Sequence, residues 1–188
     1  MQTRGLAPNV ITYNAVISAC EKGRECQEAL ELFKDMQTRG LTPNVITYNA
    51  VISACEKGRE CQEALRLFNE MQTRGHAPNI ITYSAIIEVL SVTNEITLMH
   101  NIVKVAILSG IWNDVKVKRN SIDALDLHNC SVAVSKALIR HYILEFNSVY
   151  DAKSSTLREM LLITGRGNHV LDDGRKGVLR EEIEIFVK

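Results

Sequence analysis

Two groups of residues in the second half of the chain have the types and spacing that acid–base chemistry on a phosphate would need. Asp126 and His128 lie two residues apart, and Thr-Gly-Arg-Gly-Asn-His occupies residues 164–169. Glycines in such a loop allow backbone N–H groups to approach a phosphate closely, and Arg166 adds a cation suited to phosphate oxygens. A carboxylate and histidines beside a held phosphate could supply the proton transfers that cleave a phosphodiester.

Each group follows a predicted strand of a small α/β layer. The predicted elements are a strand, a helix, a strand and a helix, over residues 121–128, 131–146, 160–163 and 179–186. This order argues for two parallel strands, whose carboxyl ends meet at one edge of the sheet. Asp126 and His128 would then face the glycine-rich loop. The residues also allow a second interpretation, because short glycine-rich loops are common and Asp126 could be a turn residue.

The first part of the chain is a tandem repeat. Residues 1–35 and 36–70 differ at four of 35 positions, and a third copy begins at Met71 before it diverges. A fixed period of this size indicates a solenoid, in which one supersecondary unit is stacked on the next. Met1 occupies the same place in its unit as Met36 and Met71. We therefore expect Met1 to be an internal methionine of a longer array.

Each repeat predicts a pair of helices. In the first helix, apolar side chains recur at i, i+3, i+4 and i+7, at Tyr13, Val16, Ile17 and Cys20. The second helix has its own apolar stripe, at Ala29, Leu32, Phe33 and Met36. Gly23 fits a stop for the first helix, and Pro43 with Asn44 turns the chain after the second.

Composition excludes some classes of partner and leaves others open. Lys+Arg and Asp+Glu each total 22, so any nucleic-acid surface must be local. No apolar run reaches the roughly 18 residues that a membrane span needs, and no membrane partner is expected. The five cysteines have no secretory signal before them, which indicates a reducing compartment. We interpret them as small buried apolar residues rather than as ligands or disulfides.

In a stack of helix pairs, the first helices line one concave side. That side carries one apolar and one small polar residue per repeat: Ile11 and Asn14, Ile46 and Asn49, and Ile81 and Ser84. A small polar side chain can meet the edge of one splayed base while apolar neighbours sandwich that base. Alternatively, Asn14 and Asn49 are solvated polar residues near a helix start.

Two segments and the period carry a family resemblance. Pro-Asn-Val-Ile-Thr-Tyr-Asn, Glu-Ala-Leu-x-Leu-Phe and the 35-residue spacing resemble the pentatricopeptide repeat (PPR) family. The Trp/Gly/Tyr signature of the related tetratricopeptide repeats is missing. The PPR frame gives repeats over residues 10–44, 45–79 and 80–114, and the resemblance implies that they bind single-stranded RNA.

The PPR resemblance also implies which residues read the bases. The family uses the fifth and last residues of each repeat, here Asn14 with Asn44, Asn49 with Asn79, and Ser84 with Asp114. Family usage implies a pyrimidine for each Asn/Asn pair and a purine, with guanine preferred, for Ser/Asp. The implied target is 5′-pyrimidine-pyrimidine-guanine-3′, and the sandwiching residues would be Ile11, Ile46 and Ile81.

Three motifs together resemble the Smr domain, a small nuclease-like module found on some plant PPR proteins. They are Leu-Asp-Leu-His, Thr-Gly-Arg-Gly-x-His and Gly-Val-Leu-Arg, at residues 125–128, 164–169 and 177–180. The resemblance implies binding and cleavage of RNA, with DNA as a further candidate partner. It assigns catalysis to Asp126 and His128 with His169 in support, and phosphate binding to Thr164, Gly165, Arg166 and Gly167.

Within that resemblance, we expect His128 to be the general base, with Asp126 as its orienter or a metal contact. Mg²⁺ is the candidate cofactor, although the sequence identifies no set of metal ligands. The family adds strands after its last helix, whereas this chain stops at Lys188, so both ends resemble truncations.

The predicted architecture is an α-helical solenoid followed by a small, incomplete α/β domain of βαβα order. The predicted boundaries are 1–114 for the repeats, 115–120 for a linker and 121–188 for the Smr-like domain. The favoured function is RNA processing in a plastid or mitochondrion, although no targeting segment is visible. The alternatives are an RNA-binding adaptor with an inert Smr remnant and a helical protein-interaction scaffold. The oligomeric state stays open.

Overall fold

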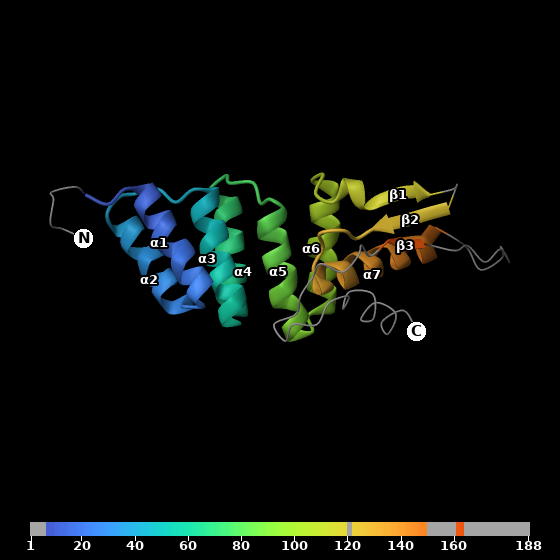
Figure 1. Ribbon diagram of the computed structural model, residues 1–188, viewed down its shortest axis with the longest axis horizontal. Helices are drawn as coiled ribbons and strands as arrows, with labels where there is room; N and C mark the ends of the chain where they lie inside the picture. The colour runs from blue at the N-terminus through green and yellow to red at the C-terminus, as the bar shows by residue number, and fades with distance from the viewer. Residues whose placement is uncertain (1–6, 120–121, 150–160, 164–188) are drawn as a thin grey trace. The chain divides into compact units, whose positions relative to one another are not determined.

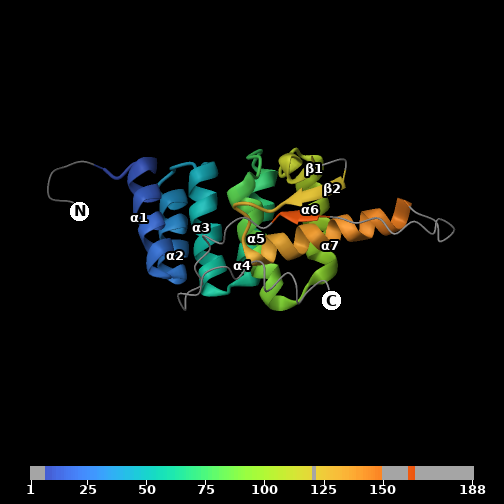
Figure 2. The same ribbon diagram turned by 45° about the vertical axis from the view of Figure 1, so that its right-hand side comes forward.

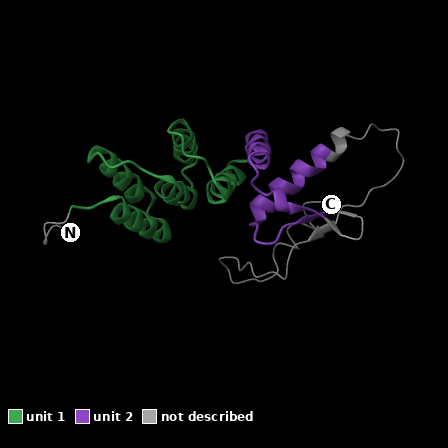
Figure 3. Ribbon diagram, turned by 90° about the horizontal axis from the view of Figure 1, so that it is seen from above, with its two compact units in different colours: residues 1–94 green, residues 95–188 purple. Residues whose placement is uncertain are grey.

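A computed structural model describes residues 7–119, 122–149 and 161–163 of the chain. The chain forms two compact units, residues 1–94 and residues 95–188, and each is considered by itself (Figure 3). No helix in these described ranges is long and apolar enough to cross a membrane.

The first unit is a row of packed helices (Figure 1). In chain order these are α1 (Val10–Gly23), α2 (Cys26–Thr38), α3 (Val45–Gly58), α4 (Cys61–Thr73) and α5 (Ile80–Thr93). Within each of the first two repeats the two helices pack together, and α3 also packs against α1, α2 and α5. The predicted stacking of helix pairs is therefore confirmed for this unit.

The first helix of each repeat begins at the same kind of cap. Asn9, Asn44 and Asn79 are the N-caps, and the threonine three residues later completes a capping box in each case. The Asn side chain accepts a hydrogen bond from the backbone N–H of that threonine, whose side chain accepts from the backbone N–H of the cap. Such boxes satisfy two backbone donors that a helix start would leave unpaired.

The first helix ends at the predicted glycine, but that glycine is not the left-handed cap. Gly23 is the last helical residue, but the left-handed residue that ends the helix is Arg24, with φ 61°. Arg59 takes the same conformation after α3, with φ 60°. The glycine that precedes each cap therefore does not serve to adopt a left-handed backbone conformation.

Aromatic side chains join successive repeats. The Phe33 ring of α2 packs edge-on against Tyr48 of α3, with ring centroids 5.4 Å apart. The contact recurs one repeat later between Phe68 and Tyr83 at 5.7 Å. Burial, together with a hydrogen bond from the Tyr48 hydroxyl to Glu70, raises the pKa of Tyr48 to about 12. The repeating contact makes one core continuous across the repeats.

The second unit contains a three-stranded sheet. Its elements are α6 (Ile96–Leu108), the short 3₁₀ helix η1 (Asn113–Val115), β1 (Lys116–Arg119), β2 (Ile122–Asp126), α7 (Val132–Val149) and β3 (Leu161–Ile163). The strand order is β1-β2-β3, with β1 antiparallel and β3 parallel to β2. Figure 2 shows α7, which connects the two parallel strands, lying along the sheet. The predicted parallel pair is therefore present.

Two features of this unit differ from the expected organisation. Lys116–Arg119, expected within a linker, forms β1 and pairs with β2. Its alternation of cations with Val117 suits an edge strand, because charged side chains discourage further pairing. In addition, α6 belongs to this unit and packs against α7, where the rings of His100 and His141 lie 5.2 Å apart. Burial lowers the pKa of His141.

Candidate base-reading interface

The structure brings together the first two predicted base-reading pairs. Asn14 lies on α1, and Asn44 caps α3 of the next repeat, so each pair spans two repeats. The Asn14 Nδ2 group donates to Asn44 Oδ1 at 3.4 Å. One repeat later, Asn49 Nδ2 donates to Asn79 Oδ1 at 3.2 Å. All four side chains are half-buried, so each pair remains accessible at the surface.

A threonine joins each of these pairs. Thr47 Oγ1 donates to Asn14 Oδ1 at 2.6 Å and accepts from the Asn44 backbone N–H at 3.1 Å. In the next repeat, Thr82 Oγ1 donates to Asn49 Oδ1, also at 2.6 Å. Both threonines are fully buried. The same hydroxyl therefore accepts a hydrogen bond in the helix cap and donates one to the Asn of the preceding repeat.

The hydrogen bonds leave more donors than acceptors for a ligand at these pairs. Asn44 Oδ1 already accepts from Thr47 N at 3.0 Å as well as from Asn14. Asn14 Oδ1 accepts the Thr47 hydroxyl and keeps one lone pair. Among the described residues, the Nδ2 group of Asn44 makes no hydrogen bond, and Asn14 Nδ2 makes one of its two. A base edge with acceptors therefore finds more partners here than one with donors.

Exposed isoleucines flank the pairs at the predicted spacing. Ile11, Ile46 and Ile81 are 76%, 61% and 54% exposed, although isoleucine is usually buried. Each lies on the first turn of a repeat's first helix, three residues before the polar base-reading position. The three side chains supply apolar surface beside each polar position, as a sandwiched base requires.

The third predicted pair falls in two different units. Ser84 is half-buried on α5 of the first unit. Asp114 is exposed in η1 of the second unit. The pairing of Ser84 with Asp114 therefore stays a prediction.

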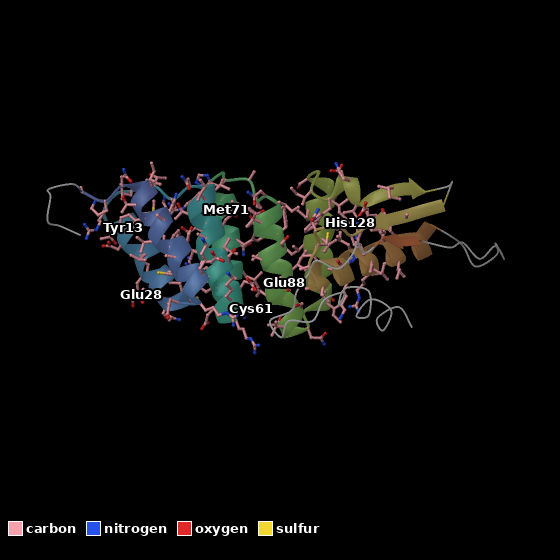
Figure 4. All side chains as sticks on the ribbon, in the orientation of Figure 1. Tyr13, Glu28, Cys61, Met71, Glu88 and His128 are labelled. Carbon is pink, nitrogen blue, oxygen red and sulfur yellow. The ribbon has the colours of Figure 1, made fainter. Side chains whose placement is uncertain are left out.

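In the second unit, the structure brings the two predicted catalytic residues together. Asp126 ends β2, and His128 lies just past that end (Figure 4). Asp126 Oδ1 accepts a hydrogen bond from the His128 backbone N–H at 3.1 Å and also contacts the His128 ring at Nδ1. About half of the His128 side chain is exposed, so its other ring nitrogen can face a substrate. This arrangement fits a histidine base held by a carboxylate.

The other predicted residues of that site lie outside the described residues. They are the phosphate-binding Thr164, Gly165, Arg166 and Gly167, and the supporting His169. Within the described ranges, no group of three or more His, Cys, Asp or Glu side chains is arranged to hold a metal ion. All five cysteines are free thiols.

Thr47 and Thr82 contribute to the candidate site but were not identified from the sequence. Both were visible as the third residue of a repeat, at the same spacing as the base-reading positions. Their link to Asn14 and Asn49 could not be deduced, because it crosses from one repeat to the next and depends on how the helices pack.

Comparisons with known proteins address the repeats. The sequence model of the PPR repeat family matches residues 8–57 and 43–91. No curated protein matches the chain. PPR10 from maize has a TM-score of 0.55 at 21% identity, over 81% of this chain and 20% of PPR10. The chain thus spans about a fifth of that protein.

Two similar structures were solved with RNA. PPR10 in complex with an 18-nt psaJ RNA element has a TM-score of 0.54 at 22% identity, over 79% of this chain and 20% of that one. The PPR domain of Arabidopsis thaliana protein-only RNase P 1, in complex with tRNA, has a TM-score of 0.55 at 16% identity. That match covers 74% of this chain and 70% of that domain. Residues 8–91 therefore match the pentatricopeptide repeat family model, and the chain shares a helical-repeat fold with these structures.

Proposed function

We propose that the repeats bind single-stranded RNA and that each repeat contacts about one base. The observation that carries this proposal is the 35-residue recurrence of a half-buried Asn pair, with Nδ2 hydrogens that no described residue accepts, beside an exposed isoleucine. A base edge bearing acceptors can meet the donors while its faces pack on the isoleucines of successive repeats. The two similar structures solved with RNA support the same ligand class.

The proposed sequence preference is a pyrimidine at each of the first two repeats. Asn14 with Asn44, and Asn49 with Asn79, offer the same arrangement of donors, so both should select the same base type. Guanine at the third repeat rests on the PPR resemblance of Ser84 and Asp114. Because the whole chain has no net charge, any phosphate contacts must come from a local group of cations.

Replacing Ile81 with alanine is expected to weaken binding of a pyrimidine-rich single strand about fivefold, because the smaller side chain gives up roughly 1 kcal/mol of apolar packing against the base. Ile80→Ala is the matched control, because Ile80 is 51% exposed on the same helix but is not a predicted sandwiching residue. Fluorescence anisotropy with single-stranded and duplex RNA measures both. Equal weakening by the two variants, or equal affinity for duplex and single strand, would contradict base sandwiching.

A second candidate function is cleavage of the bound RNA by the second unit. The observation that favours it is the contact of Asp126 with His128 at the end of a strand that has a parallel neighbour. His128 would take the proton of the attacking hydroxyl, and Asp126 would orient the imidazole. The Smr resemblance of the three motifs supports the same assignment. On that resemblance, the substrates would be plastid or mitochondrial transcripts, which the location of a fluorescent fusion would test.

His128→Ala is expected to abolish any defined cuts in end-labelled single-stranded RNA while leaving its affinity unchanged, because binding resides in the repeats. The assay should be run with and without Mg²⁺. Cuts that persist in the variant would remove His128 from the chemistry. Binding without cuts in the unaltered chain would instead favour the RNA-binding adaptor.

A further inference from the structure

We propose that Thr47 and Thr82 are positioning residues of the RNA site. Each hydroxyl holds the base-reading Asn of the preceding repeat in one orientation, with Oδ1 on the threonine and Nδ2 on the cap Asn of the next repeat. The inference rests on the proposed RNA function for its consequence, but the positioning itself is a property of the RNA-free chain. It adds a third, buried residue to each two-residue pair.

The geometry of the hydroxyl supports this role. A threonine hydroxyl has one proton to donate, and the Asn14 Oδ1 atom at 2.6 Å is nearer to Thr47 Oγ1 than Asn44 Oδ1 at 3.1 Å. The Thr82 hydroxyl shows the same choice, with Asn49 Oδ1 at 2.6 Å and Asn79 Oδ1 at 3.2 Å. The proton therefore goes to the Asn of the preceding repeat in both cases.

The position of the hydroxyl is itself fixed. Thr47 is completely buried, and its Oγ1 accepts the backbone N–H of Asn44, while its own backbone N–H donates to Asn44 Oδ1. The capping box thus holds the threonine side chain in one rotamer. A carboxamide alone can turn by 180° and exchange its oxygen and nitrogen. The anchored Thr47 donor at 2.6 Å, together with the longer bond from Asn14 Nδ2 to Asn44 Oδ1 at 3.4 Å, selects one orientation of Asn14.

The fixed orientation of the amide determines which base edges the pair accepts. With Oδ1 engaged by the threonine, the Asn pair presents mainly donors and favours base edges with acceptors, such as N3 and O2 of cytosine. Without the hydroxyl, the amide of Asn49 can also present its oxygen, and adenine, which offers both a donor and an acceptor, becomes acceptable. Thr82 would therefore control selectivity at the base that Asn49 reads.

The chain provides a matched control at Thr12. Thr12 forms the same capping box with Asn9, with Thr12 N donating to Asn9 Oδ1 at 3.0 Å. Its hydroxyl has no partner in a preceding repeat within the described part of the chain. Thr12→Val therefore removes the same cap hydroxyl as Thr47→Val and Thr82→Val, but it leaves every base-reading Asn intact.

The test combines a readout without RNA and a readout with it. In NMR spectra of the full chain, Thr82→Val should shift and broaden the side-chain amide signals of Asn49 and leave those of Asn14 unchanged. Thr47→Val should do the reverse, and Thr12→Val should affect neither. Thr82→Ser, which keeps the hydroxyl, should restore the Asn49 signals.

With RNA, Thr82→Val should lower the preference for cytosine over adenine about fivefold at the single nucleotide read by Asn49, the usual weight of one hydrogen bond. Unchanged Asn49 amide signals in Thr82→Val, or an equal effect of Thr12→Val, would overturn the positioning role. If the unaltered chain binds no RNA but the amide signals respond as expected, the positioning stands and the proposed RNA function fails.

Discussion

Replacing Gly58 with alanine should destabilise the first unit by about 1–3 kcal/mol, the usual cost of overpacking a core. A Cβ at Gly58 would lie 2.7 Å from Cys26 Cβ and 3.3 Å from Cys26 Sγ. Cys26 is buried at the start of α2, so no flexible side chain can give way. Relief requires a shift of α3 against the preceding repeat. Chemical denaturation followed by circular dichroism measures the free energy of unfolding.

Gly23→Ala is the matched control, with the opposite expected sign. Gly23 ends α1, whose sequence is identical to that of α3, but an added Cβ would meet only Glu25 Cγ, at an ordinary 3.5 Å. Alanine should therefore stabilise by up to about 1 kcal/mol through its higher helix propensity. A stabilising Gly58→Ala, or equal changes in both variants, would contradict the close approach of α3 to Cys26.

Much of the first unit could be predicted from the sequence because its signals are local or periodic. The 35-residue period and the apolar spacing predict stacked helix pairs, and α1 ends at the predicted Gly23. The two Asn pairs recur with the same period, so both could be assigned by resemblance, and the structure brings each together. The exposure of Ile46 could also be predicted, because Ile46 lies outside the apolar stripe that packs its helix.

Features that depend on contacts between repeats could not be predicted. Leu32 was expected in the apolar stripe of α2, but it is half-buried, whereas Leu30 is buried at 7% exposure. The packing of α2 against both α1 and α3 determines which residues are covered. Gly58 looks like a helix stop, yet the structure explains it by the neighbouring Cys26. The role of Thr47 likewise arises only when α3 is placed against α1.

In the second unit, the alternating sequence pattern correctly predicts the strand β2. Asp126 at the end of β2 and the parallel pairing with β3 follow from the order of elements. The segment Lys116–Arg119 is predicted to lie in a linker because it joins the repeats to the Smr-like motifs and carries three cations. Its pairing with β2 supplies hydrogen bonds that composition does not reveal.

Asn49→Ala is expected to remove base selectivity at one nucleotide of the bound RNA, and Asn14→Ala at the adjacent nucleotide. A good contact between a side chain and a base discriminates by about 1–3 kcal/mol, or about 5- to 150-fold in affinity. Both variants should fold normally, because the orphaned hydroxyls of Thr82 and Thr47 can still reach Asn79 and Asn44, at 3.2 and 3.1 Å. The two substitutions thus remove equivalent side-chain hydrogen bonds, one in each of two successive repeats.

The most direct test of base-by-base reading is a double-mutant cycle between these residues and the RNA. Anisotropy would give the affinities of the unaltered chain, Asn14→Ala and Asn49→Ala for strands with cytosine or adenine at each of two adjacent nucleotides. We predict that each variant loses selectivity at one nucleotide only, and that the affected nucleotide moves by one position between the variants. Equal weakening of all four RNAs by both variants would contradict the account.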